Sequence, residues 1–143
     1  MVRLIATYLA AALAFAAVDY VWLSQIGPMV YRPTLDPVLR PIDNQVDLPV
    51  AVVFYLAYIL GLTALAIWPN RDKPLIQTTL FGAMLGAMCY ATYDLTNQAT
   101  LKVWATHITI ADILWGAFVT AVGATAGGWV LRRLAGPARA ATT

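Results

Sequence analysis

Long apolar runs, each interrupted by at most one formal charge, dominate the hydrophobic pattern of this sequence. A helix that crosses a bilayer needs about 20 consecutive, mainly apolar residues. Four segments meet that requirement: Leu4–Ile26, Leu48–Trp68, Leu75–Gln98 and Thr106–Leu131. The pattern predicts an all-α integral membrane protein, a four-helix bundle that forms a single transmembrane domain over residues 1–135. Residues 136–143 are predicted to be a disordered tail.

The first apolar run also has features of a secretory signal peptide. Arg3 precedes the run, and Ala14-Phe15-Ala16 resembles a cleavage site. The run continues through Trp22 and Leu23, however, which makes it longer than a signal core. We therefore expect an uncleaved first helix.

The basic residues between the apolar segments predict the orientation of the bundle. If the N-terminus is cytoplasmic, that side holds six basic residues: Arg3, Arg71, Lys73, Arg132, Arg133 and Arg139. The other side then holds three: Arg32, Arg40 and Lys102. Because Lys and Arg accumulate on the cytoplasmic side of membrane proteins, both termini are predicted to be cytoplasmic.

The first connection, from about Gly27 to Asp47, is long and has prolines at positions 28, 33, 37 and 41. Proline lacks a backbone donor and fixes φ, which favours extended or turning backbone. We expect an extracytoplasmic segment with room for one short helix, able to cap the bundle from outside.

Each apolar segment that carries a charge carries an aspartate: Asp19, Asp94 or Asp112. At a rise of 1.5 Å per residue, each aspartate lies roughly 6–10 Å inside the outer boundary of its helix. Charge at such depth costs roughly 2.5–3.5 kcal/mol even on mild insertion scales. The three aspartates are therefore predicted to share one layer and to point into the bundle.

Small residues share a helix face with these aspartates. The stripes are Gly82, Gly86, Tyr90 and Asp94 in the third segment, Asp112, Gly116, Thr120, Ala124 and Gly128 in the fourth, and Ala12, Ala16 and Asp19 in the first. Small residues spaced by four allow membrane helices to approach closely, so these faces are predicted to pack together.

Aromatic side chains populate the same layer. Asp19 and Trp22 share a helix face by their spacing of three, and so do Asp112 and Trp115. Phenol and indole hydrogens can donate to carboxylates and offset the cost of their burial. The candidate ligand or proton site is Asp94, Asp112, Asp19, Asn97, Tyr93, Tyr90, Tyr55, Tyr58, Trp22 and Trp115.

Composition agrees with a membrane protein and excludes several other classes. The chain is 61% hydrophobic and 11% charged, against about 25% charged for a soluble domain. Its net charge of +2 gives no support for nucleic-acid binding. The single Cys89, expected to be a buried small hydrophobe, excludes an internal disulfide, and one His107 argues against a metal site. We expect no cofactor and no bound metal.

The segment YDLTNQATLKVWATHITIADILWGAF resembles the signature of a bacterial membrane-protein family, domain of unknown function 2177. The matching residues are Tyr93 to Leu101, Trp104, and Asp112 to Gly116. The pattern at Asp19 to Leu23, the Tyr31-Arg32 pair and the stretch from Phe54 to Gly61 are also similar. The resemblance covers nearly the whole chain and implies a four-helix protein of the bacterial inner membrane. It implies no activity.

Three functions are compatible with these residues. The first is binding or conduction of protons, a small cation or an amine-type solute, with Asp94 and Asp112 as the main charges and Asp19 as a third. The second is a membrane-embedded enzyme that acts on a lipid or another hydrophobic substrate with an Asp pair as acid and base. The third is an accessory subunit of a larger membrane complex, in which the aspartates only fix helix register. Because four helices are few for a complete pathway, we expect a homo-oligomer or a membrane-complex partner.

Overall fold

Four long helical segments make up the computed structural model, which describes residues 1–41 and 46–135. The segments long and apolar enough to cross a membrane are Val2–Leu35, Leu48–Asn70, Leu75–Thr100 and Thr106–Arg133. The described residues form helices and no strand. The predictions of an all-helical chain and of four spans are confirmed. The expected tail, residues 136–143, lies outside the described residues.

The first helical segment is longer than the sequence predicts. It consists of α1 (Val2–Val21), a π-helical turn η1 (Trp22–Ile26) and α2 (Gly27–Leu35), and the backbone of Gly27 is already helical. The first connection was expected to leave room for one short helix, and α2 is such a helix, although it continues the first helix without a break. Pro28 lies directly after the π-helical turn η1, whose wider backbone leaves room for a proline ring that would clash in a regular helix.

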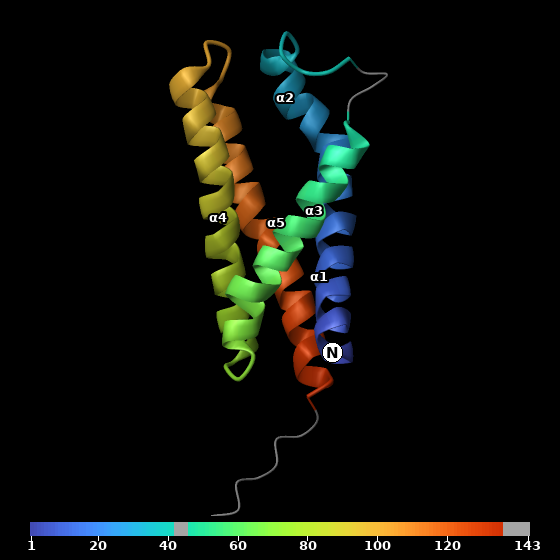
Figure 1. Ribbon diagram of the computed structural model, residues 1–143. Helices are drawn as coiled ribbons and strands as arrows, with labels where there is room; N and C mark the ends of the chain where they lie inside the picture. Colours follow the sequence, from blue (N-terminus) through green and yellow to red (C-terminus); the bar gives the residue numbers. More distant parts are fainter. Residues whose placement is uncertain (42–45, 136–143) are drawn as a thin grey trace, which may run out of the picture.

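α5 (Thr106–Arg133) is the central helix of the bundle, and α4 (Leu75–Thr100) and α1 pack on two of its sides (Figure 1). α4 and α5 pair along their lengths as an antiparallel hairpin, and α1 packs on another side of α5. α3 (Leu48–Leu62) crosses the bundle obliquely, continues through η3 (Thr63–Ile67) and ends in η4 (Trp68–Asn70). α3 packs on α1, whereas η3 packs on α4 and α5. α3 and α4 therefore diverge in the half of the bundle away from the N-terminus, which we call the distal half (Figure 1).

Small residues bring α4 and α5 into close contact. A β-carbon added at Gly82 would collide with Ala124, and one added at Gly86 would collide with the backbone of Gly116. The predicted stripes are therefore the packing faces of these two helices. Gly82 faces Ala124, Gly86 faces Thr120 and Tyr90 faces Gly116, so the contacts advance by four along α4 while they recede by four along α5. This series fixes the register of the hairpin.

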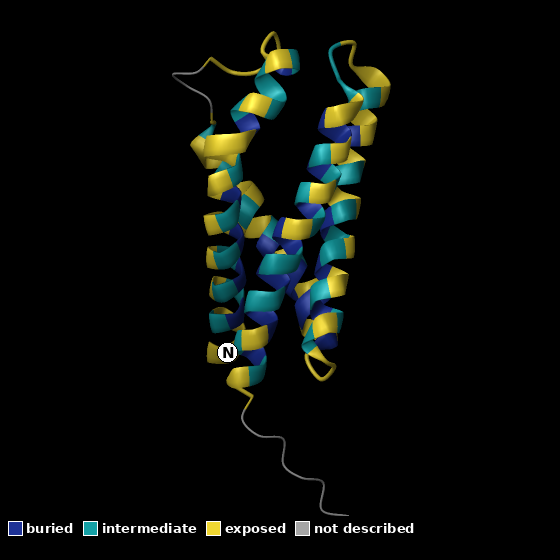
Figure 2. Cartoon of the chain, turned by 180° about the vertical axis from the view of Figure 1, so that it is seen from behind, coloured by how far each residue is buried: buried dark blue, intermediate teal, exposed yellow. Residues whose placement is uncertain are grey.

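The side chains that face away from the bundle are apolar. Leu13, Leu60 and Leu114 are each more than 60% exposed, whereas Phe15 and Leu62 are fully buried. Figure 2 shows the buried positions along the facing sides of the helices and the exposed positions on their outer sides. An apolar outer surface of this kind is suited to lipid.

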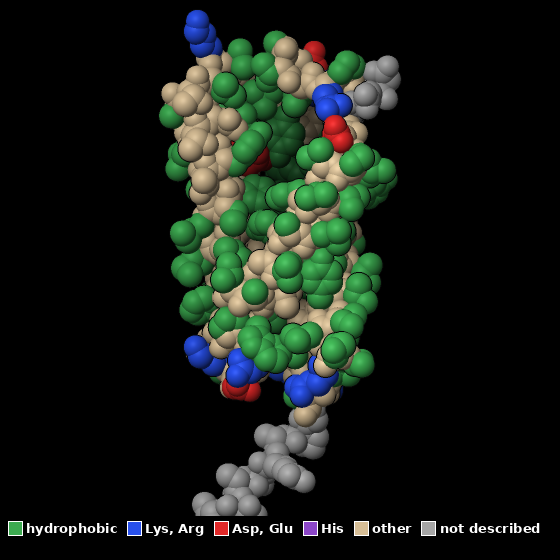
Figure 3. Space-filling view, viewed as in Figure 1, with side chains coloured by type: hydrophobic (Ala, Val, Ile, Leu, Met, Phe, Trp, Pro, Cys, Tyr) green, Lys and Arg blue, Asp and Glu red, His purple; other side chains and the backbone are tan. Residues whose placement is uncertain are grey.

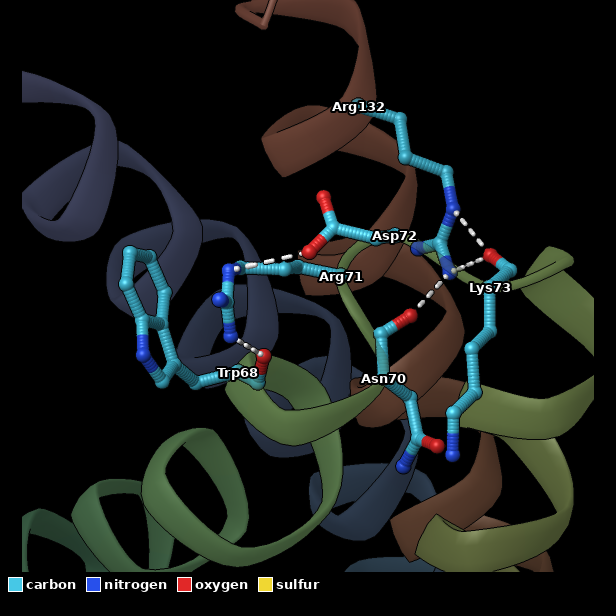
Figure 4. Close-up of polar contacts among 6 residues, drawn as sticks. All are labelled: Trp68, Asn70, Arg71, Asp72, Lys73 and Arg132. Carbon is cyan, nitrogen blue, oxygen red and sulfur yellow. Dashed lines mark hydrogen bonds and ion pairs between the residues drawn. The ribbon is translucent and has the colours of Figure 1, made fainter.

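The end of the bundle near the N-terminus, the proximal end, is closed by Arg132 (Figure 4). Its guanidinium donates to the carbonyl of Asn70 at 2.9 Å, to the carbonyl of Lys73 at 2.6 Å and to Thr78 Oγ1 at 2.9 Å. The first carbonyl ends η4 and the second lies in the turn that follows it, where a helix end leaves acceptors unsatisfied. Arg132 thus fastens α5 to that turn, so the divergence of α3 from α4 is confined to the distal half.

Candidate functional site

Asp112 of α5 is held by a chain of hydrogen bonds that begins on the first helical segment. Trp22 donates from Nε1 to the hydroxyl of Tyr31 at 2.8 Å, and that hydroxyl donates to Asp112 Oδ1. Asp112 is 7% exposed. Because Tyr31 lies on α2, the helix in the first connection supplies the donor for this carboxylate.

Asp19 of α1 has a separate pair of donors. Tyr55 of α3 donates from its hydroxyl to Oδ2, and Trp115 of α5 donates from Nε1 to Oδ1 at 3.0 Å. The rings of Trp115 and Trp22 stack with centroids 4.3 Å apart and planes inclined by 13°. The stacked indoles therefore connect the hydrogen bonds around Asp19 with those around Asp112.

Asp94 of α4 differs from both. It is 0% exposed, and neither carboxyl oxygen has a hydrogen-bond donor among the described residues. Gly86 lies against Thr120, and one turn further the Tyr90 ring lies against Gly116. The same register brings Asp94 opposite Asp112 at the next turn. The Gln98–Thr109 hydrogen bond of 2.7 Å continues the same register beyond the pair.

The register of α4 and α5 makes Asp94 and Asp112 neighbours across the helix contact, although no hydrogen bond joins their carboxyl groups in the structure. Two ionised carboxylates can only accept, so a hydrogen bond between them requires a proton. Like charges this close also repel strongly in a poorly solvated site. The arrangement can hold one proton, or one cation in place of it.

A cavity of about 640 Å³ opens beside this pair in the distal half. It is lined by Phe54 and Tyr58 of α3, by Cys89, Tyr90, Thr92 and Tyr93 of α4, and by Asp112 of α5. Figure 3 shows this face of the molecule hollowed in its upper half, with an acidic side chain visible inside. Because Phe54 and Cys89 are exposed, the cavity opens on the outer surface between α3 and α4. Its volume lies within the range of small-molecule pockets, about 300–1,000 Å³.

The family described as "Predicted membrane protein (DUF2177)" matches residues 4–129 of this sequence. The chain belongs to the DUF2177 family. The match spans most of the chain and includes all three aspartates. No curated protein and no solved structure matches the chain.

The tyrosines of the DUF2177 chain take up different positions around the pair. Tyr58 forms a 2.7 Å hydrogen bond with Thr120 Oγ1. The ring of Tyr90 covers Gly116 and lines the cavity. Tyr93 is 60% exposed, and its ring packs edge-on against Trp104 with centroids 5.7 Å apart. Tyr58, Tyr90 and Tyr93 therefore form the aromatic wall of the cavity.

The three aspartates are all buried, but their partners differ, because Asp19 accepts from Tyr55 and Trp115. One expectation about the site needs correction. Cys89 was expected to be buried, but it is exposed, because it lies on the side of α4 that faces the gap left by α3. Asn97 is half-buried, and its backbone carbonyl accepts from the N–H of Leu101 at 2.8 Å.

Tyr31 is the site residue that sequence reasoning missed. The prolines at positions 28 and 33 suggested a loop there, although the structure continues the helix past both. A signal was present: Gly27, Tyr31 and Leu35 recur at intervals of four, as residues on one helix face do. Gly27 and Leu35 are both buried, and Tyr31 between them is partly buried.

Proposed function

We propose that this protein is a multi-pass protein of the bacterial cytoplasmic membrane that binds a small organic cation, such as a protonated amine, in exchange for a proton at Asp94 and Asp112. Both termini would be cytoplasmic, which makes the distal half the extracytoplasmic half. The finer assignment rests on one observation. Asp94 is fully buried, has no donor among the described residues and lies beside a second carboxyl group.

A cation would resolve the electrostatic conflict at this pair. Two adjacent carboxylates without a shared proton repel, and a positive group placed between them is attracted to both. An ammonium group also supplies the donors that Asp94 lacks. Proton release and cation binding are therefore coupled at this pair.

The wall of the cavity favours an organic cation over a metal ion. Tyr58, Tyr90 and Phe54 present aromatic rings to the space beside Asp112. Aromatic faces attract ammonium groups by roughly 0.5–2 kcal/mol, more when the groups are desolvated. Hard divalent cations require six or more oxygen ligands, which this mainly aromatic wall does not offer.

Asp19 is assigned a structural role in this proposal. Its two oxygens already accept from Tyr55 and Trp115, so it needs neither a proton nor a ligand. Those bonds join α1, α3 and α5 at one point.

Binding of butylamine to the full chain in lipid nanodiscs tests the proposal. Asp94→Asn and Asp112→Asn remove one carboxylate each while they keep the side-chain shape, and each should weaken binding at least about tenfold, the effect of losing a charged partner. Asp72→Asn is the matched control, because Asp72 is 84% exposed in the proximal turn. It should bind as the wild type does.

The pH dependence of binding tests the exchange. The titratable groups around the pair are Tyr31 from α2, Tyr58 from α3, Cys89, Tyr90 and Tyr93 from α4, and Asp19 across the stacked indoles. Butylamine binding to the wild type should release protons, measured as a dependence of the calorimetric heat on the ionisation enthalpy of the buffer. Wild-type affinity and proton release in both Asp→Asn variants would contradict the proposal.

A further inference from the structure

A second, apolar space adjoins the cavity beside Asp112. That space has a volume of about 340 Å³ and shares Phe54, Tyr58 and Cys89 with the first cavity. It extends along α3 and α4 to Gly61, Leu65 and Leu85. We call this second space the tail groove. The shared residues place the two spaces next to each other on the outer surface between α3 and α4, and together we call them the channel.

The two ends of this channel differ in chemistry. Asp112 lies at one end with Asp94 behind it, whereas the tail groove is bordered by leucine side chains and a glycine. Phe54 and Leu65 are eleven residues apart on a continuous helical segment, and so the channel extends over roughly 16 Å along α3. Its polar end therefore lies in the distal half, and its apolar end lies nearer the middle of the bundle.

Gly61 makes the tail groove open. A β-carbon added there would meet no atom within 4 Å, whereas those added at Gly82, Gly86 and Gly116 would collide with the opposite helix. Close helix packing does not require a glycine at position 61. The glycine leaves empty space along the path that leads away from the carboxylates.

We propose that the ligand of this site is a single-chain amphiphile with a protonated amine head, whose head lies at Asp112 and Asp94 and whose alkyl chain lies in the tail groove. The inference rests on the proposed function and adds the class of ligand. Charge complementarity selects the head, because a phosphate or carboxylate head would meet two acidic groups. The apolar border of the groove selects the chain, and the opening toward lipid gives such a molecule a route of entry.

A comparison of two amines in the full chain, held in phosphatidylcholine nanodiscs, tests the inference. Butylamine carries the head with a short chain, and dodecylamine carries the same head with a long one. Gly61→Phe fills the tail groove without contact to either carboxylate. Leu60→Phe is the matched control: Leu60 is 62% exposed on the same helix and borders neither the cavity nor the groove.

The ratio of the affinities of variant and wild type is the measured quantity, because partitioning of each amine into lipid cancels in that ratio. Gly61→Phe should weaken dodecylamine binding by roughly tenfold through lost chain contacts and leave butylamine binding within about twofold. Leu60→Phe should leave both unchanged. Asp112→Asn should weaken the binding of both amines.

Each outcome bears on one inference. Gly61→Phe could bind dodecylamine as the wild type does while Asp112→Asn binds neither amine. In that case the alkyl chain does not occupy the tail groove, and the proposed function stands. If Asp112→Asn retains both amines, the proposed function itself fails. If Leu60→Phe and Gly61→Phe weakened dodecylamine binding equally, the assignment of the alkyl chain to the tail groove would also be overturned. The cause would then be a general effect of a bulky side chain on α3.

Photo-crosslinking of the wild type gives a test that depends on no variant. A long-chain amine with a diazirine at the end of its alkyl chain should label residues near Leu65 and Leu85 after irradiation, and excess dodecylamine should suppress the label. Dodecanoate, which has the same chain and an anionic head, should not suppress it. Labelling spread over the lipid-facing side chains, or suppression by dodecanoate, would overturn the inference.

Discussion

The ring of Tyr90 lies against Gly116, in the space that a β-carbon at position 116 would occupy. The contact is one helical turn from Asp94 on α4 and one turn from Asp112 on α5. Its geometry therefore sets how closely the two helices approach at the carboxyl pair.

Substitution of Gly116 by alanine should destabilise the bundle. The added methyl group would collide with the Tyr90 ring, and such overpacking typically costs about 1–3 kcal/mol. The free energy of unfolding, measured by denaturant titration in detergent micelles, gives the size of the loss. Gly61→Ala is the control, because a β-carbon there meets no neighbour. Equal stability of the two variants would contradict this assignment of the α4–α5 contact.

The α4–α5 contact was accessible from the sequence. Small residues at intervals of four on both segments identified the packing faces, and those faces are the buried ones. The same period predicted that Asp94 and Asp112 turn inward. Close approach of membrane helices depends on side-chain size, which a sequence displays directly.

The position of α3 could not be predicted in that way. Its segment carries no stripe of small residues that would mark a close-packing face, and the face that bears Tyr55 and Tyr58 does not indicate the angle at which the helix crosses its neighbours. Its oblique crossing creates both the cavity and the exposure of Cys89, so neither followed from the sequence. Helical spacing likewise indicates which residues share a helix face with an aspartate. It does not indicate which neighbouring helix supplies the hydrogen-bond donors of that aspartate.

Each of the two hydrogen bonds to Asp19 should contribute to the stability of the protein. Tyr55→Phe and Trp115→Phe each remove one donor from a carboxylate that is 5% exposed. A buried acceptor that loses its partner costs about 1–3 kcal/mol. Tyr20→Phe serves as the control, because Tyr20 is 72% exposed.

A double-mutant cycle between Tyr55 and Asp19 isolates their interaction. In an Asp19→Leu background, Tyr55→Phe should cost much less than in the wild type, because the acceptor is already absent. The unfolding free energies of the four proteins give the coupling energy. A coupling energy near zero would show that the hydroxyl of Tyr55 stabilises the protein by another route.

The Tyr31 hydroxyl should hold α2 against the bundle. Tyr31→Phe removes the link between Trp22 and Asp112, and backbone amides over residues 27–35 should then exchange with solvent faster. Hydrogen exchange followed by mass spectrometry measures the change. The comparison variant is Asp36→Asn, which breaks an exposed pair with Arg32 and should have little effect, since such pairs contribute about 0–1 kcal/mol. Faster exchange in Asp36→Asn than in Tyr31→Phe would be the opposite of what these contacts predict.

Asp94 and Asp19 should respond in opposite ways to the same neutral substitution. Asp19 accepts from two donors, so Asp19→Asn places an amide group against one of them and should destabilise the protein by about 1–3 kcal/mol. Asp94 has no donor among the described residues and faces another carboxyl group, so its ionised form is an unpartnered buried charge. Asp94→Asn removes that charge and supplies N–H donors to Asp112, and the ligand-free protein should be as stable as the wild type or more stable. Thermal unfolding of both variants in the same detergent provides the comparison. If Asp94→Asn lost as much stability as Asp19→Asn, Asp94 would be part of the scaffold, and the inference that it is kept for a ligand would lose its basis.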